Sequence, residues 1–185
     1  MLIDAKCDVN IRNSNGQTAL FQAVSNNVTC MHPAERLLTA GADPDIQDEQ
    51  GSTALHKLVY LQEKKPANTP NLLLKHGADI NISDKAGRTP LLPAACDSAG
   101  IEILQAFLDA GADPAATDNY GNTLLHLAAE NSKKGAVGRV RIVLSVISAL
   151  NHRNEYGKTA LDQALGRNTS KVVHELEQAG AKASP

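Results

Sequence analysis

Short apolar blocks alternate with polar stretches along the chain, and two kinds of block recur. One kind follows a glycine and a threonine and holds small apolar residues, as in Leu124-Leu125-His126-Leu127-Ala128-Ala129. The other has apolar residues near helical spacing and ends in Gly-Ala-Asp, as in residues 101–113. Each block can form a short helix but cannot bury an apolar face alone. The pattern therefore predicts units of turn, helix, loop and helix that bury their faces against neighbouring units.

Both blocks repeat at a nearly constant interval. Successive copies of the first block are 35, 36, 34 and 36 residues apart, counted between Gly16, Gly51, Gly87, Gly121 and Gly157. The Gly-Ala-Asp block stands at 41–43, 77–79 and 111–113, with degenerate copies at 2–8 and 176–181. A period of this length across nearly the whole chain indicates a solenoid.

Residues at the block boundaries indicate where helices start and stop. Asp84-Lys85-Ala86-Gly87 predicts a tight turn in which the glycine takes a positive φ. Thr89 is expected to cap the helix that follows, with Pro90 at the first helical position. Gly111 is expected to end the second helix of its unit as a left-handed residue.

These repeated sequence blocks resemble the ankyrin repeat, in which one helix begins with Thr-Pro-Leu-His-x-Ala and another ends in Gly-Ala-Asp. The resemblance covers residues 1–182. It implies an all-α solenoid of stacked, L-shaped helix-turn-helix units with projecting β-hairpin loops. It also implies a curved array whose concave face, made of hairpin tips and inner helices, binds another protein.

The repeat boundaries predict a single ankyrin repeat domain over residues 1–185. A partial repeat at 1–12 precedes five repeats, expected at 13–47, 48–83, 84–117, 118–153 and 154–185. The partial repeat holds only the end of an outer helix, so we expect the chain to be cut from a longer protein; a lost N-terminal cap is the alternative. The polar face of residues 171–177 is typical of a C-terminal capping helix.

Three repeats depart from the pattern between their helices. The departures are expected at residues 28–33, 62–70 and 131–138. In the second of them, Thr69 and Pro70 predict a cap and a first helical turn. The fourth repeat lacks Gly-Ala-Asp, and its outer helix is expected to end at Leu150-Asn151.

Composition narrows the class of protein. Apolar residues make up 42% of the chain and charged residues 21%, and no run approaches eighteen apolar residues. These values exclude a membrane-spanning helix and a wholly disordered chain. The first residues lack a signal-peptide pattern, and three widely spaced cysteines favour a reducing compartment. We therefore expect an intracellular, cytoplasmic and monomeric protein, with the nucleus as an alternative location.

The sequence offers no constellation of residues for catalysis. His56 and His126 share a repeat position that other repeats fill with Phe21, Leu92 and Asp162. The resemblance implies that these histidines link neighbouring hairpin backbones. Cys30-Met31-His32 lacks the spacing of a metal site, and Gly135-Ala136-Val137-Gly138 lacks that of a phosphate-binding loop. We expect no enzyme activity, cofactor, metal or small-molecule substrate.

Charge is unevenly distributed along a chain whose net charge is −2. Residues 1–118 hold 9 basic and 15 acidic residues (−6), whereas residues 119–185 hold 9 and 5 (+4). Four basic residues lie close together in sequence: Lys133, Lys134, Arg139 and Arg141. A solvated face is the favoured interpretation, with an acidic partner or nucleic acid as the alternative; nucleic acid is disfavoured because no aromatic residues lie among these charges.

Two tyrosines stand immediately before turn glycines and so at successive hairpin tips. Tyr120 and Tyr156 supply the large contact area that is typical of binding hot spots. Packing of each ring on the neighbouring hairpin is the alternative. With their neighbours they form the candidate partner-binding set: Tyr60, Lys85, Arg88, Asn119, Tyr120, Asn122, Glu130, Glu155, Tyr156 and Lys158.

The sequence predicts a non-enzymatic adaptor or scaffold that binds a partner protein or peptide through its concave face. A targeting domain excised from a larger multidomain protein, catalytic or not, is the first alternative. An intramolecular inhibitor, or a pathogen or viral effector, is another. The resemblance also implies that Asn10 and Asn81 are candidates for hydroxylation by an asparaginyl hydroxylase.

Overall fold

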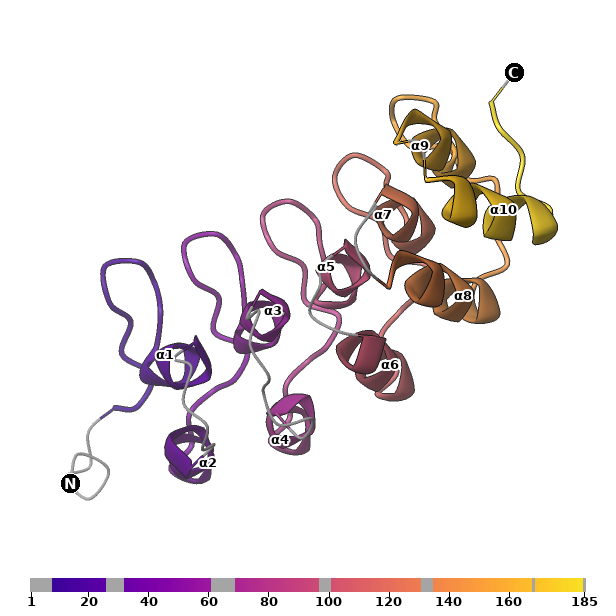
Figure 1. The fold of residues 1–185 in the computed structure, drawn as a ribbon. Coiled ribbons are helices and arrows are strands. Elements are labelled where there is room, and N and C mark those ends of the chain that lie inside the picture. The colour runs from indigo at the N-terminus through magenta and orange to yellow at the C-terminus, as the bar shows by residue number, and fades with distance from the viewer. Residues whose placement is uncertain are drawn as a thin grey trace.

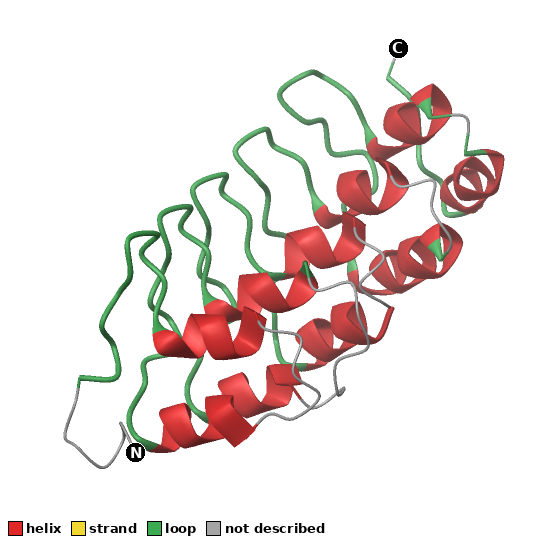
Figure 2. Ribbon diagram, turned by 60° about the vertical axis from the view of Figure 1, so that its left-hand side comes forward, coloured by secondary structure: helices red, strands yellow, loops and turns green. Residues whose placement is uncertain are grey.

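The helices form two rows, one for each kind of sequence block. The computed structural model describes residues 8–25, 32–60, 69–96, 101–130, 135–167 and 169–184. The inner row comprises α1 (Ala19–Ser25), α3 (Ala54–Val59), α5 (Leu91–Cys96), α7 (Leu124–Glu130) and α9 (Ala160–Gly166). The outer row comprises α2 (His32–Thr39), α4 (Thr69–Lys75), α6 (Ile101–Asp109), α8 (Ala136–Val146) and α10 (Ser170–Gln178). The all-α class and the predicted pairing of helices in stacked repeats are confirmed (Figures 1 and 2).

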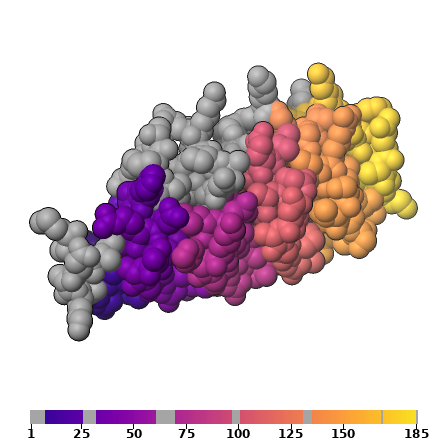
Figure 3. All heavy atoms as spheres, turned by 90° about the horizontal axis from the view of Figure 1, so that it is seen from below, coloured from indigo at the N-terminus to yellow at the C-terminus, as the bar shows by residue number. Residues whose placement is uncertain are grey.

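The repeats stack as successive bands along the long axis of the molecule (Figure 3). Each inner helix packs against the inner helix of the next repeat. The hairpin loops project from the inner row, and the array curves so that loops and inner helices lie on its concave side (Figure 1). Neighbouring repeats therefore build one continuous surface from residues about 35 positions apart in sequence.

Small apolar residues make the inner layer thin. All residues from Leu124 to Ala129 in α7 are buried, because the repeats on both sides cover this helix. Alanines such as Ala94 and Ala128 are completely buried and let neighbouring helices approach closely. Larger rings enter at few positions, for example Phe107 in α6, which is also fully buried. This packing explains why aromatic residues make up only 3% of the chain.

The inner helices begin just after threonines, as predicted, but α5 starts one residue late. The predicted cap by the Thr89 side chain is wrong, because its buried Oγ1 forms no hydrogen bond with a described residue. At the start of α1, α3, α7 and α9, the carbonyl of the threonine accepts a hydrogen bond from the backbone N–H four residues later. In α3, for example, Lys57 N–H donates to the Thr53 carbonyl at 3.2 Å. In α5 that position is Pro93, which has no N–H. The Thr89 carbonyl instead accepts from Leu92 at 3.1 Å, and the helix begins at Leu91. Pro90 therefore lies in the preceding turn and not at the first helical position.

Left-handed glycines end four of the outer helices, as the sequence predicts. Their φ values are 90° at Gly41, 86° at Gly77 and Gly111, and 89° at Gly180. The outer helix of the fourth repeat was expected to end at Leu150-Asn151, and this is wrong: α8 ends at Val146. Ile147, a β-branched residue, is extended there with φ −109° and ψ 149°, so the helix stops without a glycine.

Several sequence predictions fall on residues outside the described ranges. These include most of the partial repeat (1–7), parts of the three longer loops (26–31, 61–68 and 131–134), and Cys7, Cys30, Asn131, Lys133 and Lys134. Within the described ranges, no helix is long and apolar enough to cross a bilayer.

Candidate functional site

The hairpin loops join through the same backbone contact at every junction. An N–H at one tip donates to a carbonyl of the tip before it, at distances of 2.9 to 3.0 Å. The four pairs are Glu49 to Asn15, Lys85 to Gln50, Asn119 to Ala86 and Glu155 to Tyr120. The described loops are not paired as regular strands; they contain one isolated bridge, between Thr117 and Thr123. The projecting loops are therefore hairpin-shaped turns that are held edge to edge.

An aspartate or asparagine closes each turn. At the third hairpin, Asp84 Oδ1 accepts the N–H groups of Ala86 and Arg88 at 2.8 and 2.9 Å. Asn13, Asp48, Asp118 and Asn154 make the same pair of bonds in the other repeats. These acidic and amide side chains belong to the scaffold because their oxygens are used within the turn.

The two histidines of the inner row are buried structural links. Thr53 N–H donates to His56 Nδ1 at 3.1 Å, so Nε2 carries the proton and donates to the Arg88 carbonyl at 2.8 Å. His126 repeats these contacts with Thr123 and with the Lys158 carbonyl. Burial lowers the pKa of both histidines, which keeps the rings neutral. This arrangement is the inter-hairpin link that the family resemblance implies.

The last repeat fills the histidine position with Asp162, and the chain end supplies its partner. The Asp162 carboxylate accepts the backbone N–H of Ser184 at 3.0 Å and its hydroxyl at 2.7 Å. It also accepts Thr159 N–H at 2.7 Å and closes a capping box at the start of α9. Burial alone would raise the pKa of Asp162, but the bonds from Ser184 and Thr159 outweigh it and lower the pKa to about 2.

Tyr120 and Tyr156 stack on one another at the fourth and fifth hairpin tips. Their ring centroids lie 6.1 Å apart with an interplanar angle of 23°. The rings nevertheless remain 52% and 67% exposed. Packing on the neighbouring hairpin and availability to a partner are therefore compatible in this pair.

Five of the candidate residues line one hollow of about 460 Å³, here called the Tyr60–Tyr120 hollow. They are Tyr60, Lys85, Arg88, Asn119 and Tyr120. Tyr60 comes from the C-terminal end of α3, whereas the other four lie on the third and fourth hairpins. Sequence reasoning missed Gln50, Ser52, Asp84 and Ala86, which complete the lining. Their position one repeat earlier on the same face was the signal that could have found the first two.

Three more candidates, Glu130, Tyr156 and Lys158, line a second hollow of about 350 Å³. Arg167, which follows α9, also lines this hollow and was not among the candidates. It forms an ion pair with Glu130 at the end of α7. The remaining candidates, Asn122 and Glu155, line neither hollow. Asn122 bonds to Asp118 and to Asn154, and Glu155 is exposed beside the stacked rings.

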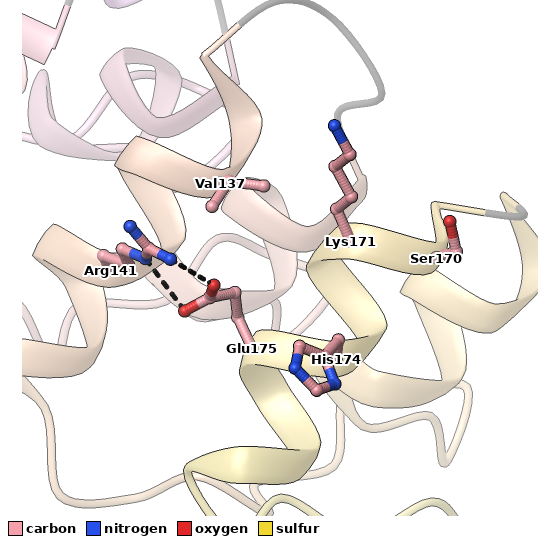
Figure 4. Close-up of a pocket in the computed structure, with 6 residues that line it drawn as sticks. All are labelled: Val137, Arg141, Ser170, Lys171, His174 and Glu175. Carbon is pink, nitrogen blue, oxygen red and sulfur yellow. Dashed lines mark hydrogen bonds and ion pairs between the residues drawn. The ribbon is translucent and has the colours of Figure 1, made fainter.

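The basic cluster inferred from the sequence does not form an open patch in the part of it that the structure describes. Arg139 is 2% exposed because α8 turns that side chain into the packing between helices. Arg141 makes a bidentate ion pair with Glu175 of α10, at 2.9 and 2.6 Å (Figure 4). The surrounding hollow on the outer helices, lined also by Val137 and His174, therefore contains an internally neutralised pair.

Comparison with known proteins places this architecture in a family. A family model described as ankyrin repeats, in three copies, matches residues 1–84, 31–118, 62–146 and 93–184. Over 78% of this chain, the sequence is 29% identical to the E3 ubiquitin-protein ligase KEG of Arabidopsis thaliana. Over 89% of this chain, it is 29% identical to the nuclear factor NF-kappa-B p105 subunit of Rattus norvegicus. It is 40% identical to Protein PhlB of Serratia liquefaciens over 54%. It spans only 11%, 17% and 43% of these three relatives. This chain belongs to the ankyrin repeat family.

Proposed function

We propose that this chain is a protein-binding adaptor or scaffold module whose site is the concave rim of repeats three to five. An ankyrin repeat domain is itself non-catalytic, and ankyrin repeats generally mediate contacts between proteins. The observation that carries the proposal is the stacked pair Tyr120 and Tyr156, which stays more than half exposed on adjacent tips. A preordered pair of rings provides contact area at little further entropic cost on binding.

The distribution of roles along the hairpins supports this assignment. The buried polar side chains of the inner layer, His56 and His126, are committed to bonds within the scaffold. Lys85 and Lys158, in contrast, form no ion pair within the described ranges and are exposed beside the two hollows. Exposed aromatic and charged side chains on a rigid scaffold are typical of protein-binding surfaces.

Affinity capture from cell lysate with a matched pair of variants tests the proposal. The rim variant is Tyr120→Ala/Tyr156→Ala, and the control is Glu102→Ala/Glu177→Ala on the exposed faces of α6 and α10. Proteins enriched by the parent chain should be retained by the outer-helix control and lost from the rim variant, with circular dichroism establishing that both variants fold. Loss from the outer-helix control alone would assign binding to the other face.

A second candidate function is a targeting domain within a longer catalytic protein. The observation that favours it is the small share of each relative that this chain spans, which is 11% for the ubiquitin ligase KEG. Sequencing of the full-length transcript tests this candidate directly. A catalytic domain in the same reading frame would support it, and a transcript encoding ankyrin repeats alone would contradict it.

A further inference from the structure

The Tyr60–Tyr120 hollow carries a net positive charge that is available to a partner. Asp84 is the one acidic residue among the described residues that line it, and its side chain is only 2% exposed. The Asp84 carboxylate accepts two backbone N–H groups on Oδ1, and Arg88 Nε and Nη2 at 3.0 and 2.8 Å on Oδ2. The pair of Asp84 and Arg88 is therefore neutral, and the exposed Lys85 contributes the remaining charge of +1.

Most of the other polar groups in this hollow can donate hydrogen bonds. A guanidinium has five N–H groups, of which Arg88 uses two on Asp84, and its side chain is 39% exposed. The side chains of Gln50 and Ser52 form no hydrogen bond with another described residue. Donors of this kind can bind the backbone carbonyls and the anionic side chain of an extended peptide.

Two tyrosines add an apolar component to the lining of this hollow. Tyr60, at the end of α3, is 40% exposed, and Tyr120, at the fourth tip, is 52% exposed. Aromatic faces of this kind contact an aliphatic or aromatic side chain of a partner with little loss of side-chain entropy.

We propose that the Tyr60–Tyr120 hollow binds an extended peptide segment in which a carboxylate side chain adjoins an apolar side chain. The carboxylate lies against Lys85 and Arg88, and the apolar side chain lies against the tyrosines. This inference rests on the proposed function, because it names the chemistry that the concave rim recognises. A monoanion matches the local charge of +1, whereas a basic segment is repelled and a phosphate dianion exceeds the available charge.

Selection from a random library of 12-residue peptides displayed on phage tests this specificity. The parent chain serves as bait and the Lys85→Glu chain as counter-selection; Lys85 is exposed and its side chain makes no hydrogen bond to a described residue, so both chains should fold. A selected peptide is then synthesised with glutamate, glutamine, lysine or phosphoserine at its acidic position. Fluorescence anisotropy measures the affinity of each form.

We expect the glutamate-to-glutamine change to weaken binding to the parent chain about fivefold to tenfold, the range of a charge-assisted contact. On a Lys85→Gln chain the same change should cost less than about twofold, since the partner charge is gone. The matched control Lys171→Gln, on α10, should behave as the parent chain does. Tyr120→Ala should weaken every form of the peptide.

Other results would overturn the inference. They are selected peptides without acidic residues, a phosphoserine form that binds tenfold more tightly, an equal glutamine effect on the Lys85→Gln chain, or a library that yields no binder. If one of these results is obtained but peptide binding is still weakened by Tyr120→Ala, the peptide specificity is wrong and the proposed function stands. If neither Tyr120→Ala nor Tyr156→Ala affects binding, both fail.

Discussion

The bases of the hairpins and their tips follow opposite rules. At the base, buried contacts recur with the same geometry: His56 in the second repeat and His126 in the fourth make the same link to a carbonyl of the next hairpin. At the tip, the residue before the turn glycine changes from Asn15 and Gln50 in early repeats to Tyr120 and Tyr156 in later ones. Contacts that must be geometrically identical in every repeat are scaffold, and side chains that are free to differ can carry specificity.

At the turn glycines, the interior junctions between hairpins differ from the last one described. Gly51 lies against the next hairpin, where an added Cβ would stand 2.7 Å from Lys85 N. Gly157 also has a positive φ, but no described atom lies within 4 Å of the position that its added Cβ would take. The terminal junction is therefore open at the turn, although Ser184 covers Asp162.

The largest effect should come from alanine at an interior turn glycine. Gly51→Ala combines left-handed strain at φ 77° with a clash against backbone atoms, and should lower the free energy of unfolding by about 3 kcal/mol. Gly157→Ala carries only the strain and should cost about 1 kcal/mol. Urea unfolding measures both. Equal losses would show that close stacking at the interior junctions has no special cost.

Removal of a buried histidine should be nearly as severe. His56→Ala leaves the Arg88 carbonyl and the Thr53 N–H without their partner in a fully buried position, and should cost about 3 kcal/mol. The exposed His174→Ala on α10 is the control and should change stability by less than about 0.5 kcal/mol. A small effect for His56→Ala in the same unfolding assay would contradict its role as a link between repeats.

Acid should weaken the interior junctions before the terminal one. Burial lowers the pKa of His56 and His126 from 6.5, so below pH 6.5 the unfolded chain takes up protons that the folded chain refuses, and stability falls. Asp162, with its pKa lowered to about 2, keeps its contribution above pH 3.8 and loses it between about 3.8 and 2.

Urea midpoints at pH 7, 6, 5 and 3 check this order. A His56→Gln/His126→Gln chain should be less stable at pH 7 but should show a flatter decline between pH 7 and 5 than the parent chain. His174→Gln is the control and should retain the parent slope. An unchanged slope in the double variant would assign the acid sensitivity to other groups.

The smallest effect on stability should follow from changes at the tips. Tyr120→Ala/Tyr156→Ala removes one stacked contact between half-exposed rings and should cost about 1 kcal/mol. Thermal unfolding followed by circular dichroism measures this loss. A loss as large as that of Gly51→Ala would make the tyrosines part of the scaffold.

Local rules predicted the repeated elements, and long-range contacts decided the rest. The turn glycines and the left-handed glycines after the outer helices depend on residues adjacent in sequence, so periodicity located them. The burial of Arg139 depends on how α8 packs: at Gly138 an added Cβ would lie 2.6 Å from Ile101 of α6, so glycine permits this close approach. The sequence alone does not specify which side of α8 faces α6, and therefore does not predict that Arg139 is buried.

In the candidate site too, local sequence predicted the positions of some residues but not the contacts between side chains. Tyr120, Tyr156 and Lys85 could be placed at hairpin tips because each has a fixed offset from a turn glycine. The neutralisation of Arg88 by Asp84 was not anticipated, because it depends on side-chain geometry within the turn. The same holds for the bond from Ser184 to Asp162, which joins residues 22 positions apart.

Hydrogen–deuterium exchange of the chain, alone and saturated with a captured partner, shows whether the hairpin tips of repeats three to five form the binding surface. If the tips bind the partner, protection increases at residues 85–88, 119–122 and 155–158, and the outer helices α6 and α10 are unchanged. Protection concentrated on α6 and α10, with the three hairpin tips unchanged, would contradict this assignment.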